Sequence, residues 1–144
     1  MIEKNKKAII KVGGWDVNVT IEDVEMYLED VKEAINAGRY RIAMNENRQD
    51  NRDLFVDYVI SEEQRKQILL SLEAADFSEI RHNTHKGYEH ELLYVFGKDV
   101  KLLNRFGSEE EQVSLYIKFN KLESLYVIVI SFHKQKYPLN YKFR

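Results

Sequence analysis

Two strand-like stretches near the C-terminus carry side chains that can transfer protons or bind phosphate. In the stretch 115–119, Tyr116 and Lys118 alternate with apolar residues, so an extended strand places both on one face. Ser131 and His133 alternate with apolar neighbours in the same way. Tyrosine can position or protonate a phosphate oxygen, histidine can act as acid or base, and lysine can neutralise phosphate charge. The alternative is a tyrosine and an unpartnered histidine that simply lie on a sheet surface.

A second polar group lies further upstream, where His82, His85 and His90 fall within nine residues, beside Glu89 and Glu91. Clustered histidines are typical of zinc sites, but this spacing differs from the H-E-x-x-H pair on one helix face. The stretch 83–88 is typical of a loop, which would hold metal ligands loosely. We therefore predict no metal site. Two interpretations remain: an ordinary polar loop, or a loop that clamps nucleic acid with Tyr88 stacked on a base.

The composition predicts one folded domain and excludes several classes of protein. Of the 144 residues, 44% are apolar, enough for a core. The longest apolar run, 125–130, is too short to cross a bilayer. The absence of cysteine excludes a disulfide scaffold and a thiol nucleophile. The charged start has no signal-peptide apolar region, so we expect a soluble cytoplasmic protein without membrane contact.

The net charge of −2 conceals a strong asymmetry along the chain. Residues 112–144 hold six basic residues and one acidic residue, whereas the remaining 111 residues hold 16 basic and 23 acidic ones. Seven aromatic residues lie in the basic part. A cationic face interleaved with aromatics is typical of nucleic-acid binding. The alternative is a solvated strand edge on which lysines prevent aggregation.

The first half of the chain favours a hairpin followed by helices. Two strand-like runs, 8–12 and 15–19, flank a Gly-Gly turn. A helix with a 3.6-residue apolar period follows Thr20, a suitable N-cap, and ends near Gly38. After these come a short strand in 39–43, a surface loop or polar helix in 45–53, an ambiguous run in 54–60, and a second helix capped by Ser61.

From Phe77 onward the apolar period is two, which predicts strands. The expected strands are Phe77–Asn83, His90–Phe96, Val100–Arg105, Gln112–Asn120 and Leu125–His133. Helices followed by antiparallel strands predict an α+β fold with the helices on one face of the sheet. We expect a single domain, 1–144, made of a hairpin (1–20), a helical part (21–76) and a sheet with a basic tail (77–144).

Four blocks occur in a fixed order along the chain: LEDVKEAINAG at 28–38, ADF at 75–77, LYIKF at 115–119 and VIVISF at 127–132. In these blocks the chain resembles the MqsR-type mRNA interferase toxins, which share the RelE-like ribonuclease fold. The resemblance extends from about Tyr27 to His133. It implies a toxin of a type II toxin–antitoxin system that cleaves single-stranded mRNA through the RNA's own 2′-OH. It also implies that the reaction needs no metal or other cofactor and that a cognate antitoxin protein neutralises the toxin.

The resemblance assigns roles to particular residues. Tyr116 and Lys118 match a Tyr-x-Lys pair whose tyrosine is implicated in activity, and His133 stands where the family commonly has a basic residue. Glu79 replaces a catalytic lysine, and Glu91 replaces a glutamine. Because carboxylates repel phosphate, we expect Arg81 to supply the lost positive charge.

A glutamate can instead be the general base, with His82 or His133 as the acid. The catalytic candidates are therefore Tyr116, His133, Lys118, Glu91, Arg81 and Glu79. The RNA-binding candidates are Lys134, Lys136, His82 and Tyr88.

Two other function classes remain open. A non-catalytic RNA- or protein-binding module on the same scaffold would fit the two glutamates, and it would bind in a salt-dependent way without releasing a cleaved product. A structural or interaction protein would depend on the acidic helical half instead.

Overall fold

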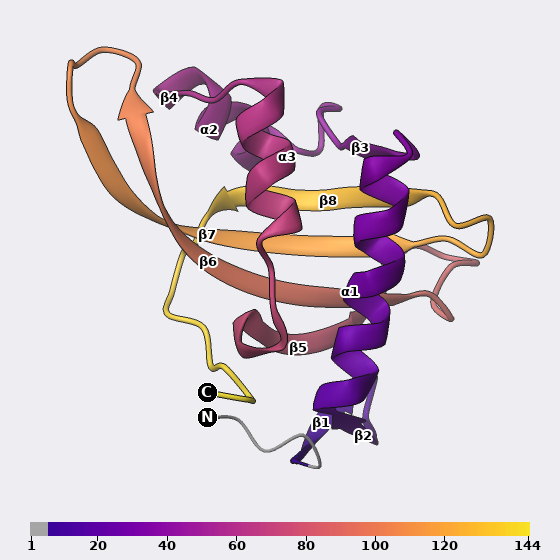
Figure 1. Cartoon of the computed structure of the whole chain (residues 1–144). Helices are drawn as coiled ribbons and strands as arrows, with labels where there is room; N and C mark the ends of the chain where they lie inside the picture. The colour runs from indigo at the N-terminus through magenta and orange to yellow at the C-terminus, as the bar shows by residue number, and fades with distance from the viewer. Residues whose placement is uncertain (1–5) are drawn as a thin grey trace.

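The computed structural model describes residues 6–144, which form an α+β fold built around one main sheet (Figure 1). The elements in chain order are β1 (Lys7–Val12), β2 (Trp15–Thr20), α1 (Ile21–Asn36), β3 (Tyr40–Ile42), α2 (Gln49–Asp57), β4 (Tyr58–Val59), α3 (Glu62–Leu70), the short 3₁₀ helix η1 (Ala74–Asp76), β5 (Phe77–His82), β6 (Leu92–Asn104), β7 (Glu110–Lys121) and β8 (Val127–Lys134). Strands β1 and β2 form a separate antiparallel hairpin. The main sheet has the order β3-β8-β7-β6-β4, and β5 also pairs with β6.

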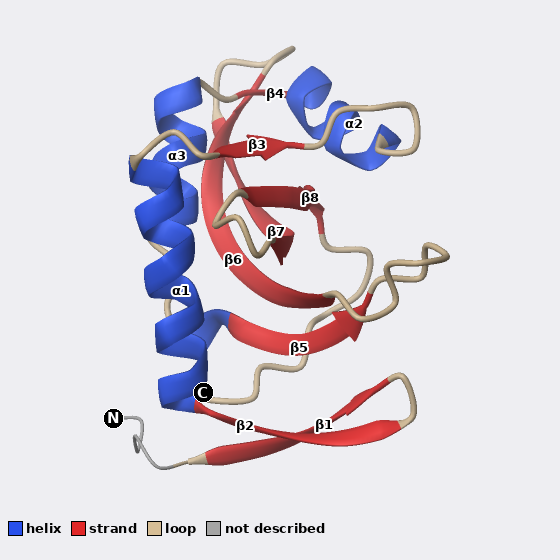
Figure 2. Ribbon diagram, turned by 90° about the vertical axis from the view of Figure 1, so that its right-hand side faces the viewer, coloured by secondary structure: helices blue, strands red, loops and turns tan. Residues whose placement is uncertain are grey.

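Helices α1 and α3 lie on the same side of the main sheet, and the hydrophobic core fills the space between them and the strands (Figure 2). Phe96, Ile117 and Phe132 stand opposite one another on β6, β7 and β8 and are fully buried there. Alternate residues of the same strands point the other way, toward the face that α1 and α3 leave open. We call this second surface the open face.

The predicted start of α1 is confirmed, because Thr20 and Asp23 form a reciprocal cap. The Thr20 hydroxyl accepts a hydrogen bond from the Asp23 amide at 3.0 Å, and the Asp23 carboxylate accepts one from the Thr20 amide at 2.9 Å. Ser61 caps α3 by accepting from the Gln64 amide at 3.0 Å. None of the helices formed by residues 6–144 is long and apolar enough to cross a membrane.

The prediction of separate strands at 90–96 and 100–105 was wrong, because β6 runs unbroken through the Gly-Lys-Asp sequence at 97–99. Gly97 pairs with Tyr116, and Asp99 pairs with Ser114, whose hydroxyl donates to the Asp99 carboxylate at 2.6 Å. Glycine commonly ends strands. Here β6 continues through Gly97 because it stays paired with the long strand β7 on both sides of the glycine.

The sheet also differs from a purely antiparallel one, because β3 pairs with β8 in parallel. The polar stretch 45–53 contributes the start of α2, and the ambiguous run 54–60 contains the end of α2 together with β4. Helix α2 lies beside β3 and β8 (Figure 2). It also contacts α3, because the Arg65 guanidinium lies 4.1 Å above the Phe55 ring.

The C-terminal tail, residues 135–144, crosses the sheet from β8 back to β5. The Lys142 amide donates to the Phe77 carbonyl at 3.2 Å, and Phe143 is fully buried in the core. On the way, the tail passes over Gly97, where an added Cβ would stand 2.8 Å from side-chain atoms of Gln135 and Leu139 and nearer still to the Tyr141 hydroxyl oxygen. The strand therefore needs glycine at this position because the tail occupies the space of a side chain.

We expect Gly97→Ala to displace the tail and to lower the free energy of unfolding by about 1–3 kcal/mol. Thermal denaturation and limited trypsin digestion at Lys136 and Lys142 would measure the two effects. Gly107→Ala is the matched control, since its Cβ would meet only Asn104 at an ordinary 3.6–3.8 Å. Equal stability and digestion of the two variants would contradict the expectation.

Candidate functional site

Five candidate side chains from three strands share the open face of the sheet. Strand β7 supplies Tyr116 and Lys118, β8 supplies His133, and β5 supplies Glu79 and Arg81. We call these five residues the strand cluster. The cluster forms because the strands stand in matching register.

Two rows of paired residues cross the sheet and align the cluster. In the first row Gly97, Tyr116 and His133 stand side by side on β6, β7 and β8. The second row runs across β5, β6, β7 and β8 and consists of Glu79, Val95, Lys118 and Ser131. In these two rows β6 presents only Gly97 and Val95, so the longer side chains of β5 and β7 can meet above it.

Tyr116 and His133 form a stacked pair, with ring centroids 5.2 Å apart and planes 9° from parallel. The His133 Nδ1 lies 2.8 Å from the Lys134 carbonyl oxygen. A carbonyl can only accept a hydrogen bond, so Nδ1 carries a hydrogen and Nε2 is the nitrogen that can exchange a proton. The stack and this bond together fix the orientation of the imidazole.

The Tyr116 hydroxyl is a donor rather than a base at neutral pH. The pKa of Tyr116 is raised to about 12. Partial burial is the largest cause, the nearby Arg81 guanidinium opposes it, and the Glu79 carboxylate contributes to the increase. A hydroxyl that keeps its proton can donate a hydrogen bond to a phosphate oxygen.

Arg81 and Glu79 form an ion pair, with Nη1 and Oε1 3.0 Å apart. The hydrogen bond that Arg81 donates to Glu79 raises the pKa of Arg81. The pair therefore holds a fixed positive charge beside Tyr116 but also places a carboxylate among the cations.

Lys118 lies half-buried among other cations. Burial, followed by repulsion from Arg48 and Arg81, lowers the pKa of Lys118, while Glu79 partly offsets the effect. A bound anion would relieve this repulsion. The strand cluster thus has the electrostatic character of an anion-binding surface.

Lys118→Met should raise the free energy of unfolding at pH 7 by up to about 1 kcal/mol, because it removes a half-buried cation at nearly constant volume. The pKa of Lys118 is lower in the folded than in the unfolded protein, so the wild type gains stability as the pH rises. The advantage of methionine should therefore shrink toward pH 10. Urea denaturation at both pH values measures this, with the exposed Lys101→Met as control. A destabilised Lys118→Met protein would contradict the argument.

The two lysine candidates that follow His133 are not members of the strand cluster: Lys134 does not share the open face, and Lys136 reaches only Asp50 at the border of the cluster. Lys134 pairs with Leu115, which points into the core, and its Nζ lies 5.0 Å above the Tyr58 ring on that side. Lys136 forms an ion pair with Asp50 at 2.7 Å.

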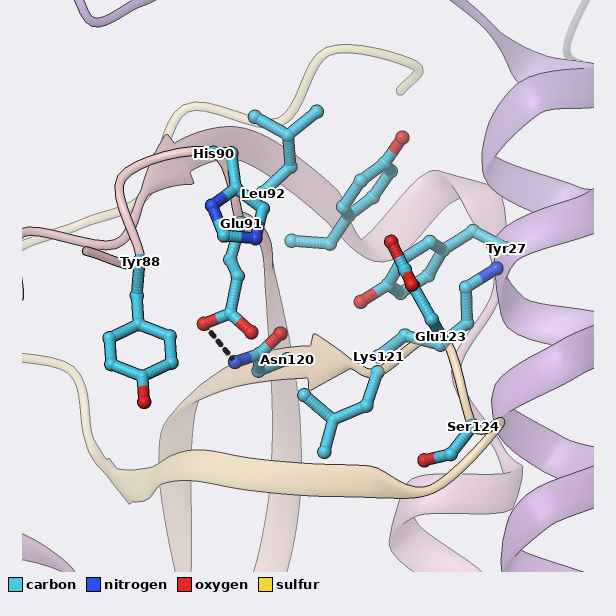
Figure 3. A pocket seen from close by; sticks show the side chains of 11 residues that line it. Tyr27, Tyr88, His90, Glu91, Leu92, Asn120, Lys121, Glu123 and Ser124 are labelled. Atoms are coloured by element: carbon cyan, nitrogen blue, oxygen red, sulfur yellow. Dashed lines mark hydrogen bonds between the residues drawn. The ribbon is translucent and has the colours of Figure 1, made fainter.

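The candidates around residues 82–91 also lie apart from the cluster. The His82 ring lies against Gly13 in the turn of the β1–β2 hairpin. Tyr88 and Glu91 belong to the 83–91 loop at the end of the sheet, and both line a cavity there (Figure 3). Glu91 accepts hydrogen bonds from the Asn83 and Asn120 amides at 2.9 and 3.1 Å.

Three residues that border the strand cluster were not predicted. Arg48 and Asp50 come from the start of α2. Arg48 contributes to the lowered pKa of Lys118, and the pKa of Asp50 is lowered mainly by Lys136 and to a smaller extent by His133. Tyr137 comes from the tail and raises the pKa of Tyr116. Their only sequence signal was the polar character of 45–53 and the aromatic character of the tail, and neither indicates which strand they would reach.

Within residues 6–144, no three histidine or acidic side chains come together in a way that could hold a metal ion. The chain matches no known family model, no curated protein and no solved structure. The geometry of the open face is therefore the basis for a functional assignment.

Proposed function

We propose that this protein is the toxin of a type II toxin–antitoxin system and a metal-independent endoribonuclease that cleaves single-stranded mRNA. The observation that carries the proposal is the stacked Tyr116–His133 pair beside Lys118 and Arg81 on one sheet face. These groups are the donors, proton carriers and cations that phosphate chemistry requires. The arrangement of α1 and α3 on the opposite face suits a RelE-like scaffold, with β1 and β2 as an additional hairpin.

In the proposed reaction the RNA 2′-oxygen attacks the adjacent phosphorus. The 2′-O–P bond forms, the P–O5′ bond breaks, and the products are a 2′,3′-cyclic phosphate and a free 5′-hydroxyl. Glu79 accepts the 2′-hydroxyl proton, and the His133 Nε2 delivers a proton to the departing 5′-oxygen. The Tyr116 hydroxyl, Lys118 and Arg81 stabilise the negative charge on the phosphate oxygens.

The test is incubation of purified protein with single-stranded RNA in the presence and absence of EDTA. We expect equal cleavage in both, ends carrying a 2′,3′-cyclic phosphate, and no cleavage of an RNA with a 2′-deoxy group at the cut site. Protection by EDTA or cleavage of the deoxy substrate would overturn the proposed chemistry. Expression should also arrest growth, and co-expression of a cognate antitoxin should restore it.

A second candidate function, a non-catalytic RNA-binding module, is favoured by one observation. Glu79, in an ion pair with Arg81, places a carboxylate within the cationic cluster, and a carboxylate repels phosphate. Such a module would bind RNA with a steep salt dependence and release no product. The cleavage assay combined with a binding titration at two salt concentrations separates the two functions.

A further inference from the structure

A cavity of about 630 Å³ lies at the end of the main sheet, between the 83–91 loop and the turn that joins β7 to β8 (Figure 3). Its lining includes Tyr27, Tyr88, Glu91, Leu92, Asn120 and Lys121. The volume suits a ligand with the size of a single nucleotide, and the lining combines aromatic side chains with polar and charged ones. None of the roles assigned to the strand cluster uses this cavity.

Two hydrogen-bond acceptors at the cavity are held in fixed orientations. Glu91 Oε1 accepts from Nδ2 of Asn83 and from Nδ2 of Asn120, and Asn120 is 6% exposed. The bond to Glu91 uses one of the two amide hydrogens of Asn120 and fixes the orientation of the amide, so its oxygen is placed as an acceptor. Figure 3 shows this oxygen and the second Glu91 carboxylate oxygen on the same side of the Glu91–Asn120 hydrogen bond. A ligand must therefore present donors to this corner of the cavity.

Among the RNA bases, guanine presents the matching pattern. Its Watson–Crick edge carries a ring N1–H and an exocyclic N2 amino group, two adjacent donors that the second Glu91 oxygen and the Asn120 oxygen can accept together. Adenine and cytosine each present one donor beside a ring nitrogen acceptor, which the carboxylate repels. Uracil has a single N–H between two carbonyls. The acceptor pair thus discriminates for guanine.

Aromatic side chains line the cavity beside these acceptors. The Tyr88 side chain is 56% exposed and can stack on an incoming base. On the opposite side, Tyr27 and Tyr94 stack at 3.7 Å and form a rigid wall. Lys121 also lines the cavity; its Nζ lies 4.8 Å above the Tyr27 ring and forms an ion pair with Asp30 at 2.7 Å.

The cavity continues from the strand cluster along β7. Asn120 follows Tyr116 and Lys118 at the same alternating positions of the strand, about 13 Å beyond Tyr116. We infer that the cavity is a guanine-binding subsite, which seats one base of a single-stranded RNA whose backbone crosses the strand cluster. The inference deepens the proposed function and rests on it for the path of the RNA. It moves Glu91 from the chemical step to base recognition.

The test measures binding of 2′-O-methyl single-stranded RNA oligonucleotides, which cannot be cleaved through a 2′-OH, by fluorescence anisotropy. Three oligonucleotides differ only at one position, which holds guanine, adenine or inosine. We expect the guanine oligonucleotide to bind at least tenfold more tightly than the adenine one, with inosine between them because it lacks the N2 amino group. Equal affinity for guanine and adenine would overturn the inference.

Glu91→Gln is the decisive variant, because its amide oxygen still accepts from Asn83 and Asn120 while its amino group faces the guanine donors. We expect it to remove the preference for guanine over adenine. Glu89→Gln, the same change in the same loop, is the control, since Glu89 bonds the Gly87 amide and does not line the cavity. A preference that survives in Glu91→Gln overturns the inference.

Separate measurements of binding and of cleavage distinguish the nuclease proposal from the guanine-subsite proposal. A guanine preference without cleavage of ordinary RNA would refute the nuclease and leave the subsite. If the protein cleaves RNA but Glu91 has no effect on any base preference, the subsite is refuted and the nuclease remains.

Discussion

His133→Ala should lower the rate of RNA cleavage by about 10²–10³-fold while leaving the affinity for RNA nearly unchanged. The proposed role of His133 is to deliver a proton, and removal of a positioned acid typically costs this much. The imidazole is held by its stack on Tyr116 and by the Lys134 carbonyl, so an alanine in its place supplies neither the proton nor the stack. Single-turnover cleavage of a labelled RNA, with a separate binding titration, measures both quantities.

Two further observations would distinguish a proton-transfer role from a structural one. The variant should lose the limb of the pH–rate profile that depends on a protonated imidazole, and added imidazole should restore part of the rate. His85→Ala is the control, because His85 is exposed in the loop away from the strand cluster. Full activity of His133→Ala would remove His133 from the mechanism.

Asn51→Asp should lower the free energy of unfolding by about 3 kcal/mol or more at pH 7. Asn51 is 1% exposed, and its Nδ2 donates to the carbonyls of Ala43 and Ile130 at 2.8 and 2.9 Å. Its Oδ1 accepts from the Phe132 amide at 2.8 Å. Aspartate keeps this acceptor but places a buried negative charge opposite two carbonyl oxygens.

The effect should depend on pH in a defined direction. Burial beside carbonyls raises the pKa of the introduced carboxyl in the folded state, so the folded protein binds its proton more readily than the unfolded one. The loss of stability relative to the wild type should therefore be smaller at pH 4 than at pH 7. Urea denaturation at both pH values tests this. Asn47→Asp, the same change at an exposed position, should stay within about 0.5 kcal/mol of the wild type.

Asn51 also shows how α2 reaches the candidate site. The side chain bridges β8 where the β7–β8 register shifts, between the pairs Lys118–Ser131 and Phe119–Val129. This shift lets β8 keep Ser131 and His133 on the open face and Val129 in the core. One amide therefore ties α2, with Arg48 and Asp50, to the edge of the strand cluster. A single polar residue in a polar stretch gives no sign of this role before the structure is known.

Local patterns predicted much of the fold because they act over a few residues. The 3.6-residue period and the Thr20 cap locate α1, and the period of two places Tyr116 and Lys118 on one strand face. Such local signals do not predict features that depend on contacts between distant segments of the chain. Gly97 was interpreted as the end of a strand, whereas it lies inside β6 because the pairing with β7 continues through residues 97–99. Tyr141 and Leu139 of the tail occupy the space above it.

From the sequence alone it follows that the chain is an α+β protein whose basic, aromatic C-terminal part can offer tyrosine, lysine and histidine on strand faces. Alternation and capping are short-range effects and can be derived without knowing the neighbours. Only the tertiary structure decides that Tyr116 stacks on His133, that Arg81 and Glu79 reach the same place, and that Lys134 faces the opposite side. The physical reason is strand register: a pairing between residues far apart in the chain is set by the packing of the whole sheet.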